Sequence, residues 1–458
     1  MRKYFTGIAL ILAALVVVPL YAGPASAAQA AAPAQQPSYT MPEYNAFQNC
    51  QAQKDPAAKL KCLDGFITQF PNSTLLEYVY QVYYQTDYQL KKFAEAIQYA
   101  DKLVALGDKA DLALRVQALQ AHVQLFALAF PSGTPPTQDD LTKERDAAKL
   151  GAQLLTQYKN SPSSKVTDDQ YKAALSLFAT AEGLADMQLK DYPAAITAFK
   201  ASISNNPADA VSEYRIGLAY LAMTPPQSLD GFWALGRSIN EKVPDADKIK
   251  DYLRKAILAY EQPGCDNQVD AQLDELLQLS ANAPDRPATY TIPTADDLAK
   301  IRQASNIITV ITDLGGGGDK AKMTWLAICG AEFPEVVGKV IDVQKADAYV
   351  DFMVFTGATP DEMQNATMAN MDVKVWTSTP PASAAPAASS TGTASTPVPP
   401  QPDVVRLQKD DGIRFSGTLV SYDPSPFLLH WDQVKVDPSI LPPAGPGKHT
   451  PHKIPPKQ

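Results

Sequence analysis

The chain has 458 residues, of which 45% are hydrophobic and 19% charged, and its formal net charge is −9 at pH 7. This length fits about two or three domains. Because an acidic surface repels phosphate backbones, nucleic acid is not expected as a partner.

Residues 1–28 have the pattern of a secretory signal peptide. Arg2 and Lys3 form a charged start, residues 8–18 are an apolar run, and the expected cleavage site consists of Ala25, Ser26 and Ala27. Residues 1–28 contain two bases and no acid, so removing them takes the net charge from −9 to −11. We expect a periplasmic or secreted protein without a transmembrane segment after cleavage, because no later stretch reaches about 20 apolar residues. Residues 29–42, rich in Ala, Pro and Gln, are expected to be a disordered lead-in.

Four cysteines in an exported chain suggest two disulfides. Cys50 and Cys62 flank a helix-to-helix turn at residues 54–56, so a bridge between them would tie the first helical hairpin. Cys265 and Cys329 would then form the second disulfide. The alternative is that these thiols are free and buried. Metal binding is not expected, because the chain has four histidines and none lies near a cysteine pair.

Small residues recur at a fixed spacing in the middle of the chain. Gly183 and Gly217 are 34 residues apart, and Ala195 and the aromatic Phe199 lie between them. Pro207 closes the unit, because proline cannot extend a helix. This pattern resembles the tetratricopeptide (TPR) repeat. The resemblance implies a superhelical stack of antiparallel helix pairs that presents a concave surface to a protein partner.

We interpret residues 43–312 as one TPR-like helical domain. Residues 73–105 carry aromatic or small residues at family positions, but Tyr84 stands where the family prefers glycine. This repeat is therefore expected to pack its helices differently or more widely. Trp233 is expected to be a core residue of an inserted helix. The other helices are expected over residues 110–129, 140–158, 229–239, 245–260, 266–280 and 294–312.

The resemblance also implies a binding surface, because the first helix of each unit lines the concave face in this family. The exposed positions map to Tyr78, Gln81, Gln85, Tyr88, Thr180, Leu184, Gln188, Tyr214, Arg215 and Leu218. Tyr78, Tyr88 and Tyr214 are the expected hot spots, since tyrosine offers a large contact area at small entropic cost. Alternatively, these tyrosines pack between neighbouring helices. The Lys and Asn that clamp a chain-terminal carboxylate in some family members are absent from this register, which favours an extended or helical partner segment.

Beyond residue 330 the apolar pattern changes to the period of two that is typical of strands. Five strands are expected over residues 337–343, 348–355, 372–376, 412–422 and 427–436. Their order, with Gly417 at a bend in the fourth strand, resembles a small OB-like barrel. Residues 313–377 would form its first part and residues 403–437 its last two strands. A Pro/Ala/Ser/Thr linker (residues 378–402) would separate them, and residues 438–458 would be a disordered tail. The alternative is that the linker separates two independent pieces.

Nothing in the sequence indicates a catalytic site or a cofactor. The glycines at 315–318 lack the Lys and Ser/Thr of a phosphate-binding loop and are interpreted as a hinge. His122 lies in an apolar helix and His430 in a strand, and no Gly-x-Ser-x-Gly turn is present.

The expected fold is mainly α, a TPR-like α-solenoid followed by a five-stranded barrel. The expected function is that of a non-enzymatic exported scaffold for a protein or peptide partner. The alternatives are a structural component of a cell-envelope assembly and an enzyme with an unrecognised site.

Overall fold

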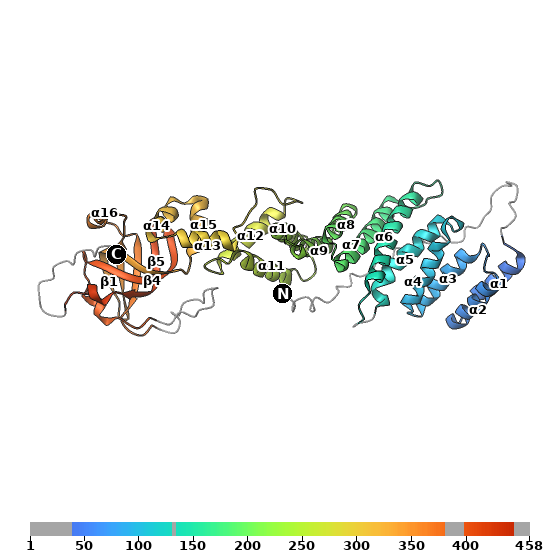
Figure 1. Cartoon of the computed structure of the whole chain (residues 1–458), viewed down its shortest axis with the longest axis horizontal. Helices are drawn as coiled ribbons and strands as arrows, with labels where there is room; N and C mark the ends of the chain where they lie inside the picture. The colour runs from blue at the N-terminus through green and yellow to red at the C-terminus, as the bar shows by residue number, and fades with distance from the viewer. Residues whose placement is uncertain (1–38, 131–133, 381–397, 444–458) are drawn as a thin grey trace. The chain divides into compact units, whose positions relative to one another are not determined.

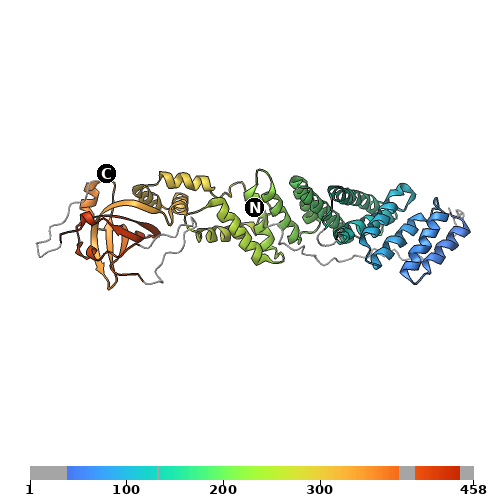
Figure 2. The ribbon, with the colours of Figure 1, turned by 60° about the horizontal axis from the view of Figure 1, so that its bottom comes forward.

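The computed structural model describes residues 39–130, 134–380 and 398–443. The predicted signal peptide, residues 29–38 of the predicted lead-in, residues 381–397 of the linker and residues 444–458 of the tail lie outside the described residues. The chain divides into two compact units, Met1–Ala246 and Asp247–Gln458, which Figures 1 and 2 show in blue to yellow-green and in yellow-green to red.

Unit 1 is built from consecutive helices that pack as antiparallel pairs (Figure 1). They are α1 (Met41–Gln51), α2 (Pro56–Gln69), α3 (Leu76–Gln89), α4 (Phe93–Ala105), α5 (Leu112–Ala129), α6 (Gln138–Lys159), α7 (Asp168–Leu189), α8 (Tyr192–Asn205), α9 (Ala210–Ala222) and α10 (Ser228–Asn240).

Several helix starts follow directly from the local sequence. Thr40, Thr137 and Thr167 each cap a helix. The threonine hydroxyl oxygen accepts a hydrogen bond from the N–H of the third helical residue, and the side chain of that residue accepts one from the threonine N–H. Pro56 occupies the first turn of α2, where its missing N–H has no intrahelical partner to lose. The helical part begins at Met41, so residues 41 and 42, assigned to the lead-in from the sequence, belong to α1.

Glycines allow the first helix of a pair to approach the second closely. A Cβ at Gly183 in α7 would lie 2.6 Å from the ring of Phe199 in α8, which is fully buried. The equivalent Gly217 in α9 faces Leu235 of α10, where an added Cβ would be 2.7 Å from Cγ. Both glycines therefore have the packing role that the repeat pattern predicts.

The pair α3–α4 reaches close packing by the opposite arrangement. Tyr84, which replaces the expected glycine, is buried in one cluster with Ala96 and Ala100 of α4. The large side chain thus lies on the first helix and the small ones on the second. This is the different packing predicted for the repeat.

Unit 2 begins with α11 (Ala246–Glu261), α12 (Gln268–Ser280), α13 (Ala295–Ala304), α14 (Ile307–Gly316) and α15 (Gly318–Ile328). Helices α13 to α15 share one hydrophobic core with the barrel that follows, including Leu298, Leu314, Phe352 and Trp431. The helical part therefore continues to Ile328 rather than ending at residue 312. The glycines interpreted as a hinge form the end of α14 and its turn into α15.

The barrel consists of β1 (Glu332–Lys345), β2 (Tyr349–Phe355), β3 (Met371–Trp376), β4 (Gly412–Pro424) and β5 (Phe427–Val436), with the short helix α16 (Pro360–Asn365) between β2 and β3. The strands close in the order β1-β2-β3-β5-β4. The β3–β5 pair is parallel and the other pairs are antiparallel. The strands on the two sides of the linker thus form one barrel, as predicted.

Both cysteine pairs are joined in the structure. Cys50 of α1 bonds to Cys62 of α2, with their Cα atoms 5.3 Å apart. Cys265, between α11 and α12, bonds to Cys329 after α15, with Cα atoms 5.5 Å apart. The first bond ties a hairpin within unit 1, and the second ties the start of unit 2 to the segment that enters β1.

Candidate functional site

The four predicted binding residues of α3 lie along one face of the helix. Tyr78, Gln81, Gln85 and Tyr88 follow one another at intervals of three or four residues, which places them on the same side. Tyr78 is 42% exposed and Tyr88 51% exposed. Gln85 is exposed and Gln81 is half-buried. The opposite side of α3 is anchored by buried residues such as Val79 and Tyr83.

Helix α5 continues this surface. Gln81 Nε2 donates a hydrogen bond to Gln117 Oε1 of α5 at 3.3 Å, and the two helices contact each other. Gln117, Ala121 and Gln124 are half-buried and follow at intervals of four and three residues on α5. We call the surface made by Tyr78, Gln81, Gln85 and Tyr88 of α3 with Gln117, Ala121 and Gln124 of α5 the α3–α5 face.

The charged side chains of α3 and α5 have other contacts. Asp87 and His122 are buried. Glu77 accepts a hydrogen bond from the backbone N–H of Asp111 at 2.6 Å, and Arg115 pairs with Asp108 at 3.1 Å. Glu77 also bonds to the hydroxyl of Tyr78, so the α3–α5 face is lined by phenol, amide and methyl groups with one carboxylate at its Tyr78 end.

The predicted residues of α7 and α9 lie mostly between helices. Thr180 Oγ1 is 2.9 Å from Ser202 Oγ of α8, and Leu184 packs against the core of α7 to α9. Gln188 is exposed. Tyr214, Arg215 and Leu218 are half-buried, and the guanidinium carbon of Arg215 lies 5.7 Å from the ring centroid of Phe199. Burial lowers the pKa of Arg215. Of the ten predicted residues, the four on α3 thus form one group along a single helix face, with three of them exposed and Gln81 half-buried.

Gln117 and Gln124 were not among the residues predicted from the sequence. The repeat register was anchored on glycines, and α5 has none. The recurring glutamines Gln117, Gln120 and Gln124 are the available signal, since intervals of three and four residues place them on one face of a helix.

His122 forms a buried ionic cluster that connects three helices. Its Nδ1 lies 2.6 Å from Asp101 Oδ1 of α4, and its Nε2 lies 3.3 Å from Glu144 Oε2 of α6. Burial alone would lower the pKa of His122, but the hydrogen bonds to Asp101 and Glu144 outweigh it and raise the pKa to about 9. The imidazole is only 3% exposed, so a substrate does not reach it. The His122 imidazolium, held between the carboxylates of Asp101 and Glu144, therefore links α4, α5 and α6.

His430 lies on the outer side of the barrel between two carboxylates. Its Nδ1 is 3.1 Å from Asp372 Oδ2 on β3, and its Nε2 is 3.0 Å from Asp423 Oδ2 on β4. Among the residues that the structure describes, no group of three or more His, Cys, Asp or Glu is arranged to hold a metal ion.

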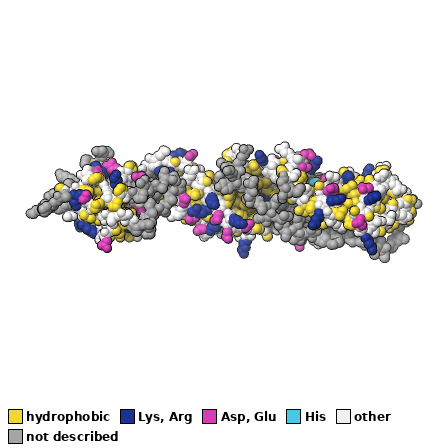
Figure 3. Space-filling model, turned by 90° about the horizontal axis from the view of Figure 1, so that it is seen from below, with side chains coloured by type: hydrophobic (Ala, Val, Ile, Leu, Met, Phe, Trp, Pro, Cys, Tyr) yellow, Lys and Arg dark blue, Asp and Glu magenta, His cyan; other side chains and the backbone are white. Residues whose placement is uncertain are grey.

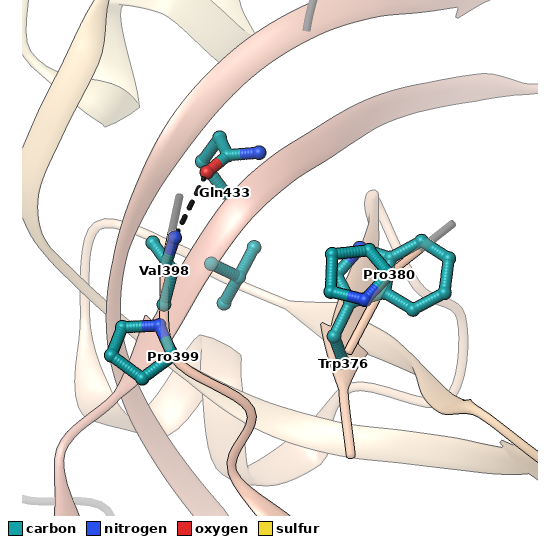
Figure 4. Close-up of a pocket in the computed structure, with 6 residues that line it drawn as sticks. Trp376, Pro380, Val398, Pro399 and Gln433 are labelled. Carbon is teal, nitrogen blue, oxygen red and sulfur yellow. Dashed lines mark hydrogen bonds between the residues drawn. The ribbon is translucent and has the colours of Figure 1, made fainter. Parts of the chain in front are cut away.

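A small pocket lies where the linker leaves and rejoins the barrel (Figure 4). It is lined by Trp376, Pro380, Val398, Pro399, Gln433 and Val434. The backbone N–H of Val398 donates to Gln433 Oε1 at 3.3 Å across it. This bond holds the returning segment against β5, so the pocket is a packing site of the linker's ends.

Two surface properties bear on the kind of partner. On the face shown in Figure 3, basic and acidic side chains are interspersed, which is not the single-sign field that steers a highly charged ligand. No helix within the described residues is both long and apolar enough to span a membrane.

No family model and no curated protein matches the chain. Among solved structures, it is similar to TTC0263, a thermophilic TPR protein of Thermus thermophilus, with 13% identity over 47% of this chain and 99% of that chain and a TM-score of 0.24. It is also similar to the TPR2AB domain of yeast Sti1 in complex with pHSP90, with 16% identity over 53% and 98% and a TM-score of 0.15. Scores this low carry no argument, so we describe the fold as TPR-like from the helix pairs of this chain.

Proposed function

We propose that this protein is a non-enzymatic scaffold that binds a protein or peptide partner through the α3–α5 face. The observation that carries the proposal is the pair of exposed tyrosines, Tyr78 and Tyr88, at the two ends of one helical stripe with amides between them. Tyrosines are enriched among the residues that dominate binding energy, and large exposed aromatic side chains gathered on one face are typical of interfaces.

The test measures the affinity of folded variants for a partner protein that the wild-type chain captures in a pull-down. We expect Tyr88→Ala to weaken binding by about 1 to 3 kcal/mol, or roughly 5- to 150-fold. Tyr252→Ala is the matched control, because Tyr252 of α11 is 43% exposed but lies in unit 2. Unchanged affinity of a folded Tyr88→Ala variant would mean that the α3–α5 face is not the site.

Substitution of the remaining predicted residues measures how far the site extends beyond α3 and α5. Tyr214→Ala in α9 and substitution of the exposed Gln188 in α7 test whether the partner also contacts the first helices of the later helix pairs. We expect a smaller effect at Tyr214, because its side chain is half-buried among its neighbours.

Export is part of the proposal. The disulfides join all four cysteines of the chain, and such bonds persist in oxidising compartments. Together with the signal-peptide pattern of residues 1–28, they support a periplasmic or secreted protein. Intact-mass measurement of the native protein should give a chain that starts near Ala28 or Gln29. A soluble cytoplasmic pool that retains Met1 would contradict export.

For the barrel we propose an OB-like module. Its closed order with the parallel β3–β5 pair supports this assignment. The barrel also supports a second candidate function, in which the protein is a structural component of a cell-envelope assembly held through unit 2. Capture of a large complex that persists with Tyr88→Ala and is lost on removal of unit 2 would favour this second function.

A further inference from the structure

We propose that the buried carboxyl group of Glu261 makes the packing of α12 against α11 sensitive to pH. In its neutral form the group is compatible with the closed helix pair, and in its ionised form it favours opening of α12. Glu261 lies in unit 2, so this role is independent of the α3–α5 face.

Glu261 is the last residue of α11, and its side chain is removed from solvent. Its exposed fraction is 0%. Among the described residues, neither Oε1 nor Oε2 has a hydrogen-bond partner. The last turn of α11, residues 258–261, contains no basic side chain to balance a negative charge. Burial and the negative end of the helix dipole therefore both disfavour a carboxylate at this position.

The polar side chain that faces Glu261 also favours the neutral acid. Gln272 of α12 contacts the carboxyl group without completing a hydrogen bond of ordinary geometry, and its Oε1 atom is likewise buried without a partner. A carboxylate only accepts hydrogen bonds, whereas a carboxylic acid has an O–H that can donate to an amide oxygen. A proton on Glu261 therefore supplies a donor to buried oxygen atoms that have none within the described chain.

The basic side chains of this region bond to backbone carbonyls. Arg286 Nη1 donates to the carbonyl oxygen of Tyr290 at 3.0 Å, and Arg302 Nε donates to that of Ala327 at 2.9 Å. The titratable and charged side chains around the carboxyl group are Tyr260 on α11, Glu275 on α12, Arg286 and Tyr290 in the segment after α12, and Asp297 and Arg302 on α13. Within the described residues, none of these cations forms an ion pair with Glu261.

The direction of the pH effect follows from the burial of Glu261. Burial raises the pKa of Glu261 from 4.5 to about 7, and the contact with Gln272 offsets only part of this rise. The closed helix pair thus holds the proton more tightly than the open one. Its stability is highest below pH 4.5 and falls as the pH rises to about 7, above which the group is ionised in both states.

The end of α11 is fixed, so α12 is the element that can move. Cys265, four residues after Glu261, is bonded to Cys329, and this bond also anchors the start of α12. Further along, the ion pair between Arg254 of α11 and Asp270 of α12 joins the two helices, but its side chains are 32% and 54% exposed. Exposed pairs contribute little to stability. A charge on Glu261 is therefore relieved by opening of α12 beyond its anchored start.

Hydrogen exchange of the full chain, followed by mass spectrometry, tests the proposal. One variant is Glu261→Gln, which keeps the shape of the side chain but cannot ionise. The control is Glu275→Gln, the same substitution at an exposed position of α12. Comparison of each variant with the wild type at the same pH cancels the effect of pH on the exchange chemistry, and circular dichroism confirms that the variants are folded.

We compare the exchange rate of the α12 amides in the wild type with that in Glu261→Gln. The ratio of the two rates should rise about 30-fold between about pH 5.5 and about pH 8, for a pKa of 4.5 in the open state and about 7 in the closed state. Glu275→Gln should show the same pH dependence as the wild type.

The same pH dependence in Glu261→Gln as in the wild type, or its loss in Glu275→Gln, would overturn the inference. Constant protection of the α12 amides of the wild type over this pH range, after correction for the exchange chemistry, would overturn it as well. This last measurement needs no variant.

Discussion

Replacing Gly183 by alanine tests the close packing of α7 on α8, and Gly65→Ala supplies a matched control. A Cβ at Gly183 would lie 2.6 Å from the ring of the buried Phe199, whereas a Cβ at Gly65 in α2 would meet nothing within 4 Å. Both glycines lie inside helices of unit 1. Alanine is favoured over glycine there by about 1 kcal/mol, so this contribution cancels when the two variants are compared.

The difference between the variants then measures overpacking, which costs about 1 to 3 kcal/mol. We expect Gly65→Ala to raise the free energy of unfolding by about 0.5 to 1 kcal/mol and Gly183→Ala to fall about 1 to 3 kcal/mol below it. Urea denaturation followed by circular dichroism measures both. Adding Phe199→Leu should restore part of the loss in Gly183→Ala. If Gly183→Ala stabilises as much as Gly65→Ala, the glycine is not there for close packing.

Three further predictions concern the links that hold each unit together. Replacing Cys50 and Cys62 by alanine should lower the free energy of unfolding of unit 1 by about 3 kcal/mol in the chain-entropy description. Peptide mapping of the native protein without reductant would contradict the bond if it finds both thiols free. His122 has a folded pKa of about 9 against an ordinary value of 6.5, so its contribution is complete below pH 6.5 and is lost as the pH rises through 9. The free energy of unfolding should fall by up to about 3 kcal/mol across this pH range. This fall should be absent in the His122→Gln variant, and the same pH dependence in that variant would refute the cluster's role. Protease cleavage between residues 381 and 397 should leave the barrel assembled, because β4 and β5 pair with β1 and β3, whereas separation of the fragments without denaturant would contradict the closed barrel.

Elements with strong local signals could be predicted from the sequence. Gly183, Phe199 and Pro207 identify a helix pair because each has one dominant physical role. The five strands were recognised from their alternation, and closure into one barrel followed because two strands alone would be marginal. The start of β1 was missed by five residues. Pro334 interrupts the strand pattern there, and it is tolerated at a register shift between Phe333 and Val336.

The candidate site was only partly predictable, because exposure depends on what the neighbouring helix presents. Thr180 was expected on the concave face, but Ser202 of α8 offers it a hydroxyl partner, which the repeat register does not reveal. Arg215 likewise packs over Phe199. On α3, Tyr84 takes the glycine position and packs inward, which leaves Tyr78 and Tyr88 on the open side. Gln117 becomes part of the site only through its contact with Gln81.

The location of the binding site can be tested most directly by site-specific photocrosslinking. A benzophenone amino acid is placed at Gln85, at the centre of the α3–α5 face, and in a second variant at Gln98, which is exposed on α4. We expect the captured partner to crosslink from position 85 and not from position 98. A partner that crosslinks from position 98 alone, or that binds with unchanged affinity without crosslinking at position 85, would contradict binding through the first helices.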